Sequence, residues 1–168
     1  MEYNSNFKLL AGSYTDDTSM MLCLMNSLYE TDKFDHNDQM ERYILWRSKG
    51  YMSVNGKCFD IGRTCSMAIG EYLLAKRLGT HNPNTYYGLN NEFNSGNGGI
   101  MRLAPIPIFF HNSKELTIKY SRLSSQVTHS SLECLESAEL MGIILYKIFN
   151  ESHESHELMN LMNLMNLN

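Results

Sequence analysis

The chain is poor in residues that interrupt helices, with only three prolines among 168 residues and few valines. Proline breaks helices and valine favours strands, so this composition favours an all-helical fold. No apolar run approaches the roughly 18 to 20 residues that a bilayer span requires. The first ten residues, MEYNSNFKLL, lack the charged and apolar regions of a targeting peptide. We therefore expect a soluble, cytoplasmic protein with no membrane partner.

An excess of basic residues is also missing, because 14 Lys and Arg residues face 18 Asp and Glu residues and the formal net charge is −4. Without a basic surface to attract phosphate backbones, we expect no nucleic-acid partner. The four cysteines include no CxxC pair, which favours free thiols in the core over a disulfide frame or a zinc site. The chain length suits one domain, which we assign to residues 1–150.

Apolar residues recur at helical spacing in most of the chain, which predicts a compact helical bundle. We expect two capping boxes, Asp38 with Glu41 and Ser130 with Glu133. Residues 50–65 are interpreted as a structural connector in which Asp60 or Thr64 caps the following helix. The predicted helices cover about residues 15–30, 38–49, 64–78, 100–110, 114–125 and 130–149.

The last residues, 151–168, repeat Leu, Met, Asn, His and Glu with a period of three. Such a period drifts around a helix of 3.6 residues per turn, so these residues do not form a straight apolar stripe. We interpret them as a low-complexity tail. Two histidines within the repeat, His153 and His156, are a weak signal for a metal site.

The stretch GSYTDDTSMML, residues 12–22, places Asp16 and Asp17 at the predicted start of the first helix, with Thr15 as its N-cap. Acidic residues in a first turn interact favourably with the helix dipole, which is one explanation. The alternative is a site for a hard cation, because a hydroxyl and two carboxylates are the oxygen ligands that Mg²⁺ prefers. Both explanations can hold together.

The segment NSGNGGIMR, residues 94–102, carries three glycines that permit close backbone approach. Its N–H groups, expected at the start of the next helix, could bind phosphate oxygens with Arg102 nearby, but the same letters also form ordinary turns. His129, in VTHSS, is either a capping or packing residue or a hydrogen-bonding partner of a nucleotide. The order of these motifs, together with GYMS, FDIG and API, resembles the ADP-ribosylglycohydrolase family over about residues 9–149.

The resemblance implies an all-α fold and a two-magnesium centre that holds the ribose of ADP-ribose during hydrolysis of its glycosidic bond. It implies that Thr15, Asp16 and Asp17 are metal ligands, and that His129 lies at the edge of the ADP-ribose site. The residues that line this site by resemblance are Ser95, Gly96, Asn97, Gly98 and Gly99. Family members close the metal site with a distal Asp-x-Asp motif, whereas this chain has no aspartate after Asp60.

We therefore expect a family bundle that is truncated, incomplete at both ends, and we assign no catalytic acid or base. One hypothesis is a magnesium-assisted hydrolase that acts on ADP-ribosylated proteins or small ADP-ribose conjugates. The other is a catalytically inactive remnant that binds ADP-ribose or has a structural role. Apolar residues of the last helix, Met141, Ile144, Leu145 and Ile148, are expected to be exposed and to favour self-association.

Overall fold

The computed structural model describes the backbone of residues 9–164, and the side chains of this range except Glu92 and residues 151–164. It is all-α, as predicted, and within the described range the β-type pairing is one isolated parallel bridge between Leu89 and His129. No helix among the described residues is long and apolar enough to cross a membrane. The elements are α1 Asp16–Thr31, α2 His36–Lys49, α3 Arg63–Leu78, η1 Glu92–Asn94, α4 Pro105–Phe109, α5 Lys114–Gln126 and α6 Leu132–Leu164.

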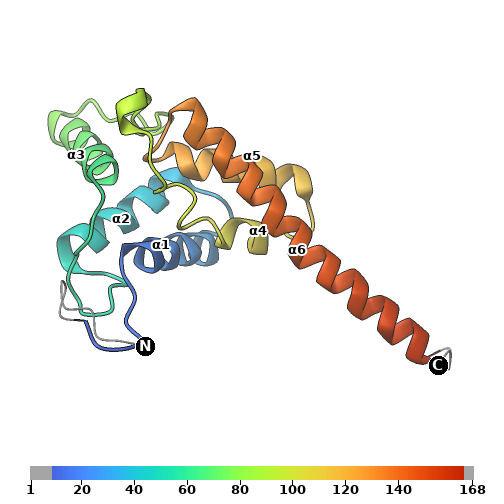
Figure 1. Cartoon of the computed structure of the whole chain (residues 1–168). Helices are drawn as coiled ribbons and strands as arrows, with labels where there is room; N and C mark the ends of the chain where they lie inside the picture. Colours follow the sequence, from blue (N-terminus) through green and yellow to red (C-terminus); the bar gives the residue numbers. More distant parts are fainter. Residues whose placement is uncertain (1–8, 165–168) are drawn as a thin grey trace.

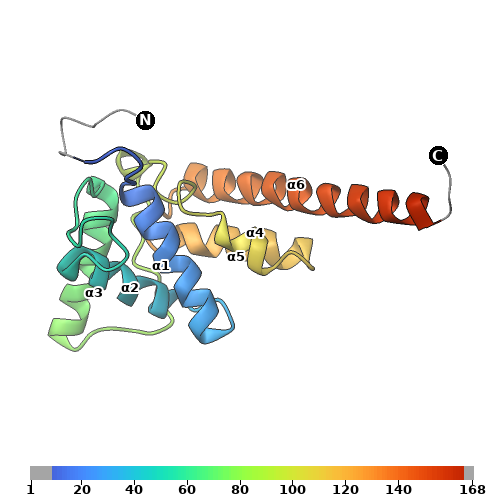
Figure 2. The ribbon, with the colours of Figure 1, turned by 90° about the horizontal axis from the view of Figure 1, so that it is seen from below.

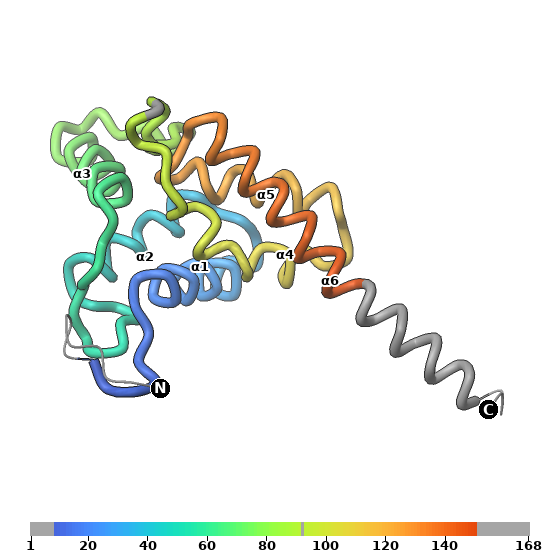
Figure 3. Tube along the Cα trace, viewed as in Figure 1, coloured from blue at the N-terminus to red at the C-terminus, as the bar shows by residue number. Residues whose placement is uncertain are grey.

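The helices form two groups that meet along α4 (Figure 1). Helix α1 packs against α2, which contacts α3, while α5 lies along the first part of α6, as Figure 2 shows from below. Short α4 contacts α1, α5 and α6 and so joins the groups. The long connection from α3 to α4 passes the N-terminal end of α6 (Figure 3), where the Ser95 hydroxyl donates to Ser131 Oγ at 2.8 Å.

Two apolar clusters form the core. The first joins α1, α2 and α3 around Trp46 and Tyr43, both fully buried, and the second joins α1, α4 and α6 around Leu24, Ile106 and Ala138. All four cysteines are free, and three of them are buried as predicted, whereas Cys58 is half-buried. The clusters place the N-terminus of α1 beside the connection that precedes α4.

Three helix starts differ from the prediction. Asp35, not Asp38, caps α2 by accepting hydrogen bonds from the N–H groups of Asn37 and Asp38. At α6 the hydroxyl of Ser131, not Ser130, accepts from the N–H of Cys134 at 3.4 Å. Both predictions of a capping box were therefore wrong by a few residues. The path of the preceding loop decides which hydroxyl or carboxylate lies close enough to the free N–H groups to accept from them.

The start of α3 has no side-chain cap, since Gly62 occupies the N-cap position. The prediction that Asp60 or Thr64 caps this helix is wrong. Instead Asp60 adopts a left-handed backbone conformation with φ of 57° in the loop before the helix, and the Thr64 hydroxyl donates to the carbonyl of Asn94 at 3.3 Å.

The extent of two helices also differs from the prediction. The segment 100–110 is helical only over Pro105–Phe109, because Pro105 lacks an N–H and starts the helix at its first position, after two turns. Helix α6 continues to Leu164, past the predicted end at residue 149. The predicted boundary at residue 150 stays a prediction, and residues 165–168 of the predicted tail lie outside the described residues.

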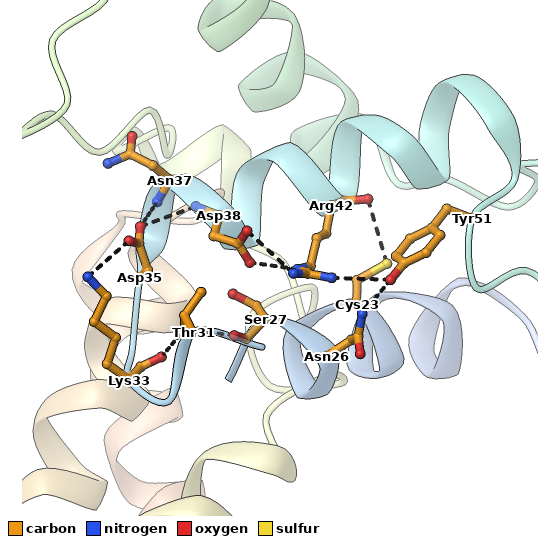
Figure 4. A network of polar contacts seen from close by, with 10 residues as sticks. All are labelled: Cys23, Asn26, Ser27, Thr31, Lys33, Asp35, Asn37, Asp38, Arg42 and Tyr51. Atoms are coloured by element: carbon orange, nitrogen blue, oxygen red, sulfur yellow. Dashed lines mark hydrogen bonds and ion pairs between the residues drawn. The ribbon is translucent and has the colours of Figure 1, made fainter. Parts of the chain in front are cut away.

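A polar network fixes α1 against α2 (Figure 4). The Arg42 guanidinium pairs with the Asp38 carboxylate at 2.6 Å and donates to the Tyr51 hydroxyl at 3.2 Å. The Asn26 amide of α1 donates to the same hydroxyl at 2.5 Å. Tyr51 belongs to the predicted connector 50–65. Through these contacts with α1 and α2, this part of the connector has a structural role.

The exposed apolar face of α6 agrees in part with the prediction. Ile144 and Ile148 are exposed and Leu145 is half-buried, whereas Met141 packs against the second core cluster. Met141 was therefore wrongly expected to lack a partner, because α4 and α5 cover this part of the helix. Self-association through the remaining face stays a prediction.

Helices α5 and α6 approach each other through small side chains. The buried face of α5 carries Thr117, Ser121, Ser124 and Ser125, all fully buried. Opposite them, a Cβ atom added to Gly142 of α6 would lie 2.2 Å from Ser121 Oγ and 2.9 Å from Ser121 Cβ. The absence of a side chain at this position is what permits the close approach.

We predict that Gly142→Ala lowers the free energy of unfolding by about 1 to 3 kcal/mol, because the added methyl overpacks the α5–α6 contact. Gly70→Ala in α3 is the matched control, since a Cβ there meets nothing within 4 Å. That control should raise stability by up to about 1 kcal/mol through helix propensity. Urea unfolding followed by circular dichroism measures both changes, and equal stability of the two variants would contradict the prediction.

Candidate active site

The N-terminus of α1 presents the carboxylates that the sequence singled out. Thr15 occupies the N-cap position, but its hydroxyl donates to Asp17 Oδ2 at 3.3 Å instead of capping the helix. Asp16 is buried with 9% of its surface exposed, whereas Asp17 is exposed. The two acids therefore differ: one faces inward and the other faces solvent.

Asp16 is held in an unfavourable environment for a negative charge. Its pKa is raised to about 6, chiefly by burial and then by the charges of Asp17 and Asp60. Asp60 comes from the loop before α3, so acids from two distant segments face each other. Asp60 was not predicted as a site residue, although its motif FDIG contributed to the resemblance.

The glycine-rich segment lies against the side chains of Cys65, Ser125 and His129. A Cβ added to Gly98 would lie 2.5 Å from His129 Cε1 and 3.0 Å from Cys65 Sγ, and one added to Gly99 would lie 2.2 Å from Ser125 Oγ. The close backbone approach that the glycines were predicted to permit is therefore made to neighbouring side chains of the protein. The expectation that these N–H groups begin the next helix is wrong, because α4 starts only at Pro105.

His129 is almost fully buried, with 3% of its surface exposed, in the turn between α5 and α6. Its Nδ1 lies 2.8 Å from Thr128 Oγ1. Burial and the nearby Arg102 lower the pKa of the imidazole to about 3. The ring is therefore neutral at physiological pH.

These segments meet at one pocket of about 170 Å³. Asp16, residues 96–98 and His129 all line it, although they are far apart in the sequence. Arg63 and Thr64, at the start of α3, line it too and were not predicted as site residues. A neighbouring pocket of about 350 Å³ shares Gly96 and Asn97 and is lined by Ser95.

Four predicted site residues do not line the smaller pocket, and one of them, Ser95, lines the neighbouring pocket instead. Thr15 and Asp17 stand beside Asp16 at the helix start, and Gly99 packs against Ser125. Arg102 is fully buried, as a structural residue would be, and its guanidinium donates to the Thr128 hydroxyl at 2.7 Å. Among the side chains that the structure describes, no group of three or more His, Cys, Asp or Glu lies close enough to hold a metal ion.

The chain matches a family of known enzymes over nearly its whole length. The model of the ADP-ribosylglycohydrolase family matches residues 2–166. Over 146 residues, or 87% of this chain, it is 36% identical to ADP-ribosylarginine hydrolase Tri1 of Serratia proteamaculans. It is similarly 36% identical, over 86% of the chain, to ADP-ribosylarginine hydrolase Tri1 of Pseudomonas putida.

A vertebrate relative is more distant: ADP-ribosylhydrolase ARH3 of Danio rerio is 28% identical over 79% of the chain. The chain spans 38%, 37% and 34% of the lengths of these three relatives, respectively. The similarity therefore covers most of this chain but well under half of each relative.

The buried Asp16 carboxylate yields a prediction about stability. Because its folded pKa of about 6 exceeds the ordinary value of 3.8, the folded chain binds the proton more tightly, and stability falls as pH rises between these values. Asp16→Asn should abolish this contribution. In metal-free buffer we expect the variant to be more stable than the natural chain at pH 7 by about 2 kcal/mol, but equal to it near pH 4.

Urea unfolding between these two pH values, with a chelator present, measures the difference. Glu30→Gln is the control, because this acid is exposed at the far end of the same helix. The control should leave the pH dependence unchanged. A difference between the Asp16→Asn variant and the natural chain that does not grow as pH rises would contradict the prediction.

Proposed function

The chain belongs to the ADP-ribosylglycohydrolase family, and from this premise we propose that it binds an ADP-ribose conjugate and takes part in hydrolysis of its glycosidic bond. One observation carries the proposal: the acidic start of α1, the 96–98 loop and His129 line a common pocket. Glycoside hydrolysis passes through an oxocarbenium-like state, which requires charge stabilisation near the ribose. The carboxylates beside this pocket suit that requirement.

The substrate class follows from the names of the relatives, which are an ADP-ribosylarginine hydrolase and an ADP-ribosylhydrolase. We propose that the conjugate is an ADP-ribosylated protein or a small molecule that carries ADP-ribose. Arg63 lies on the pocket wall and is exposed, so its guanidinium can pair with a phosphate oxygen. The loop 96–98 lines the same pocket, and the absence of a side chain at Gly98 lets the His129 ring lie against the loop, because a Cβ there would lie 2.5 Å from His129 Cε1.

We further propose that Mg²⁺ binds beside Asp16. The donor set fits a hard cation, because Asp16, Asp17 and the Thr15 hydroxyl offer oxygen atoms. The pKa of Asp16 is raised chiefly by burial and then by the charges of Asp17 and Asp60, and a bound cation would offset both effects. When bound, such an ion supplies positive charge that can orient ribose hydroxyls and a water molecule. Asp60 would add to the negative potential that attracts the cation.

A second function is favoured by one observation. The described side chains contain no group of three His, Cys, Asp or Glu that could hold a metal ion. A chain that binds ADP-ribose without hydrolysing it would need only the loop, Arg63 and His129. Binding and hydrolysis must therefore be measured separately.

We predict that the purified chain releases ADP-ribose from ADP-ribosylated arginine protein only when Mg²⁺ is present. Asp16→Ala should lower the rate by about 100-fold or more, because loss of a metal ligand removes several kcal/mol of transition-state stabilisation. Release of free ADP-ribose measured by chromatography checks the prediction. Glu30→Gln should keep the activity.

Calorimetric titration with ADP-ribose distinguishes the two functions. Binding without release would replace the hydrolase by the catalytically silent binding protein. Absence of both binding and release would contradict each of them.

Magnesium binding has its own expected signature. A ligand that binds only the folded state raises its stability as its concentration exceeds the dissociation constant. Addition of Mg²⁺ should therefore raise the melting temperature of the natural chain by a few degrees. Asp16→Asn should lose this rise, and Glu30→Gln should keep it. An equal rise in all three chains would show that the ion binds elsewhere.

A further inference from the structure

The buried residues behind His129 form a chain of polar contacts that leads to the pocket. Arg102 Nη2 donates to Thr128 Oγ1 at 2.7 Å and to the carbonyl of Ser124 at 3.1 Å. The same Thr128 oxygen lies 2.8 Å from His129 Nδ1. Arg102 and Thr128 are both fully buried. These contacts determine which atoms in this series of polar contacts carry protons.

A guanidinium can only donate hydrogen bonds, so the Thr128 oxygen must accept from Arg102. Its own proton then remains available for a nearby acceptor. The sulfur of Cys65 also lies near this hydroxyl, but sulfur is a weak acceptor compared with an imidazole nitrogen. His129 Nδ1, 2.8 Å away, is thus the stronger acceptor within reach of the hydroxyl proton, and the direction of this contact depends on the tautomer of the ring.

An Nδ1 atom that accepts a hydrogen bond carries no proton. Because burial and Arg102 keep the imidazole neutral, the ring proton must lie on the other nitrogen, Nε2. The ring contact with Thr128 is made through Nδ1, not through Nε2. Nε2 lies on the side of the ring near Gly96 and Gly98, where His129 lines the pocket.

We propose that Thr128, held by the buried Arg102, is a positioning residue that fixes His129 as its Nε2–H tautomer. The pocket thereby presents a hydrogen-bond donor of fixed direction to a ligand oxygen, such as a phosphate oxygen. The ligand part of this inference rests on the proposed function. The tautomer does not, because it follows from the contacts of the free chain.

Thr128→Val tests the role, because valine keeps the shape of threonine and removes the hydroxyl. Long-range ¹H–¹⁵N correlation spectra of the histidine rings report which nitrogen is protonated. The natural chain should show His129 with a protonated Nε2 and an unprotonated Nδ1. In Thr128→Val the two nitrogen signals should move toward each other as both tautomers become populated.

Two further variants make the test specific. Thr128→Ser keeps a hydroxyl and should retain the Nε2–H pattern. Thr117→Val removes another fully buried threonine hydroxyl, which donates to the carbonyl of Phe110 far along α5, and should leave His129 unchanged. A natural chain with Nδ1 protonated, or a Thr128→Val variant with the pattern of the natural chain, would overturn the inference.

Ligand binding supplies the second readout. Loss of one oriented hydrogen bond should weaken ADP-ribose binding by about five- to tenfold in Thr128→Val, and not in Thr128→Ser or Thr117→Val. Inorganic pyrophosphate serves as a separate probe for the phosphate contact. If the natural chain binds neither probe, the proposed function fails while the spectra still decide the tautomer. If it binds ADP-ribose and Thr128→Val binds equally well, the positioning role is wrong.

Discussion

The guanidinium of Arg102 lies at the centre of the bundle, fully buried, and none of the ion pairs within the described part of the chain includes it. Removing a charge from water costs several kcal/mol unless other groups stabilise it. Here the charge is stabilised by the Ser124 carbonyl, the Thr128 hydroxyl and the face of the Tyr43 ring, 4.7 Å from the guanidinium carbon. These partners come from two parts of the fold, α2 and the end of α5 with the turn that follows it, so these helices must be correctly placed before the charge can be buried.

This constraint extends to the candidate site because Arg102 lies three residues after Gly99, the last glycine of the glycine-rich segment. Fixing its side chain also fixes the backbone that precedes it, and that backbone then lies against His129 and Ser125. The turn has room for little more than glycine at two positions, Gly98 and Gly99. The same buried residue thus shapes the pocket wall and, through Thr128, sets the protonation of the imidazole that faces the pocket.

The sequence predicts those features that depend on local periodicity. Helices α1, α2 and α3 could be placed from the spacing of their apolar residues, and Thr15 was correctly identified as the residue before α1. The caps at Asp35 and Ser131 were missed because neighbouring residues of the same type, Asp38 and Ser130, compete for the role. Asp38 is instead engaged by Arg42, one turn further on, and Ser130 donates to the carbonyl of Gln126. Local pattern alone does not decide between such neighbours.

The site was predictable only through the order of its motifs, since residues from α1, the 96–98 loop and the turn before α6 are brought together by packing. Asp60 and Arg63 lacked a local signal, because an acid or a base in a connecting loop has no distinctive spacing. In the structure they bring charges of opposite sign to the pocket region, because Arg63 lines the pocket together with Asp16 and the charge of Asp60 acts on Asp16. An anionic ligand such as ADP-ribose is repelled by the acids unless a cation neutralises them. Binding of the proposed Mg²⁺ and binding of the ligand should therefore strengthen each other, which links the two halves of the proposed site by electrostatics.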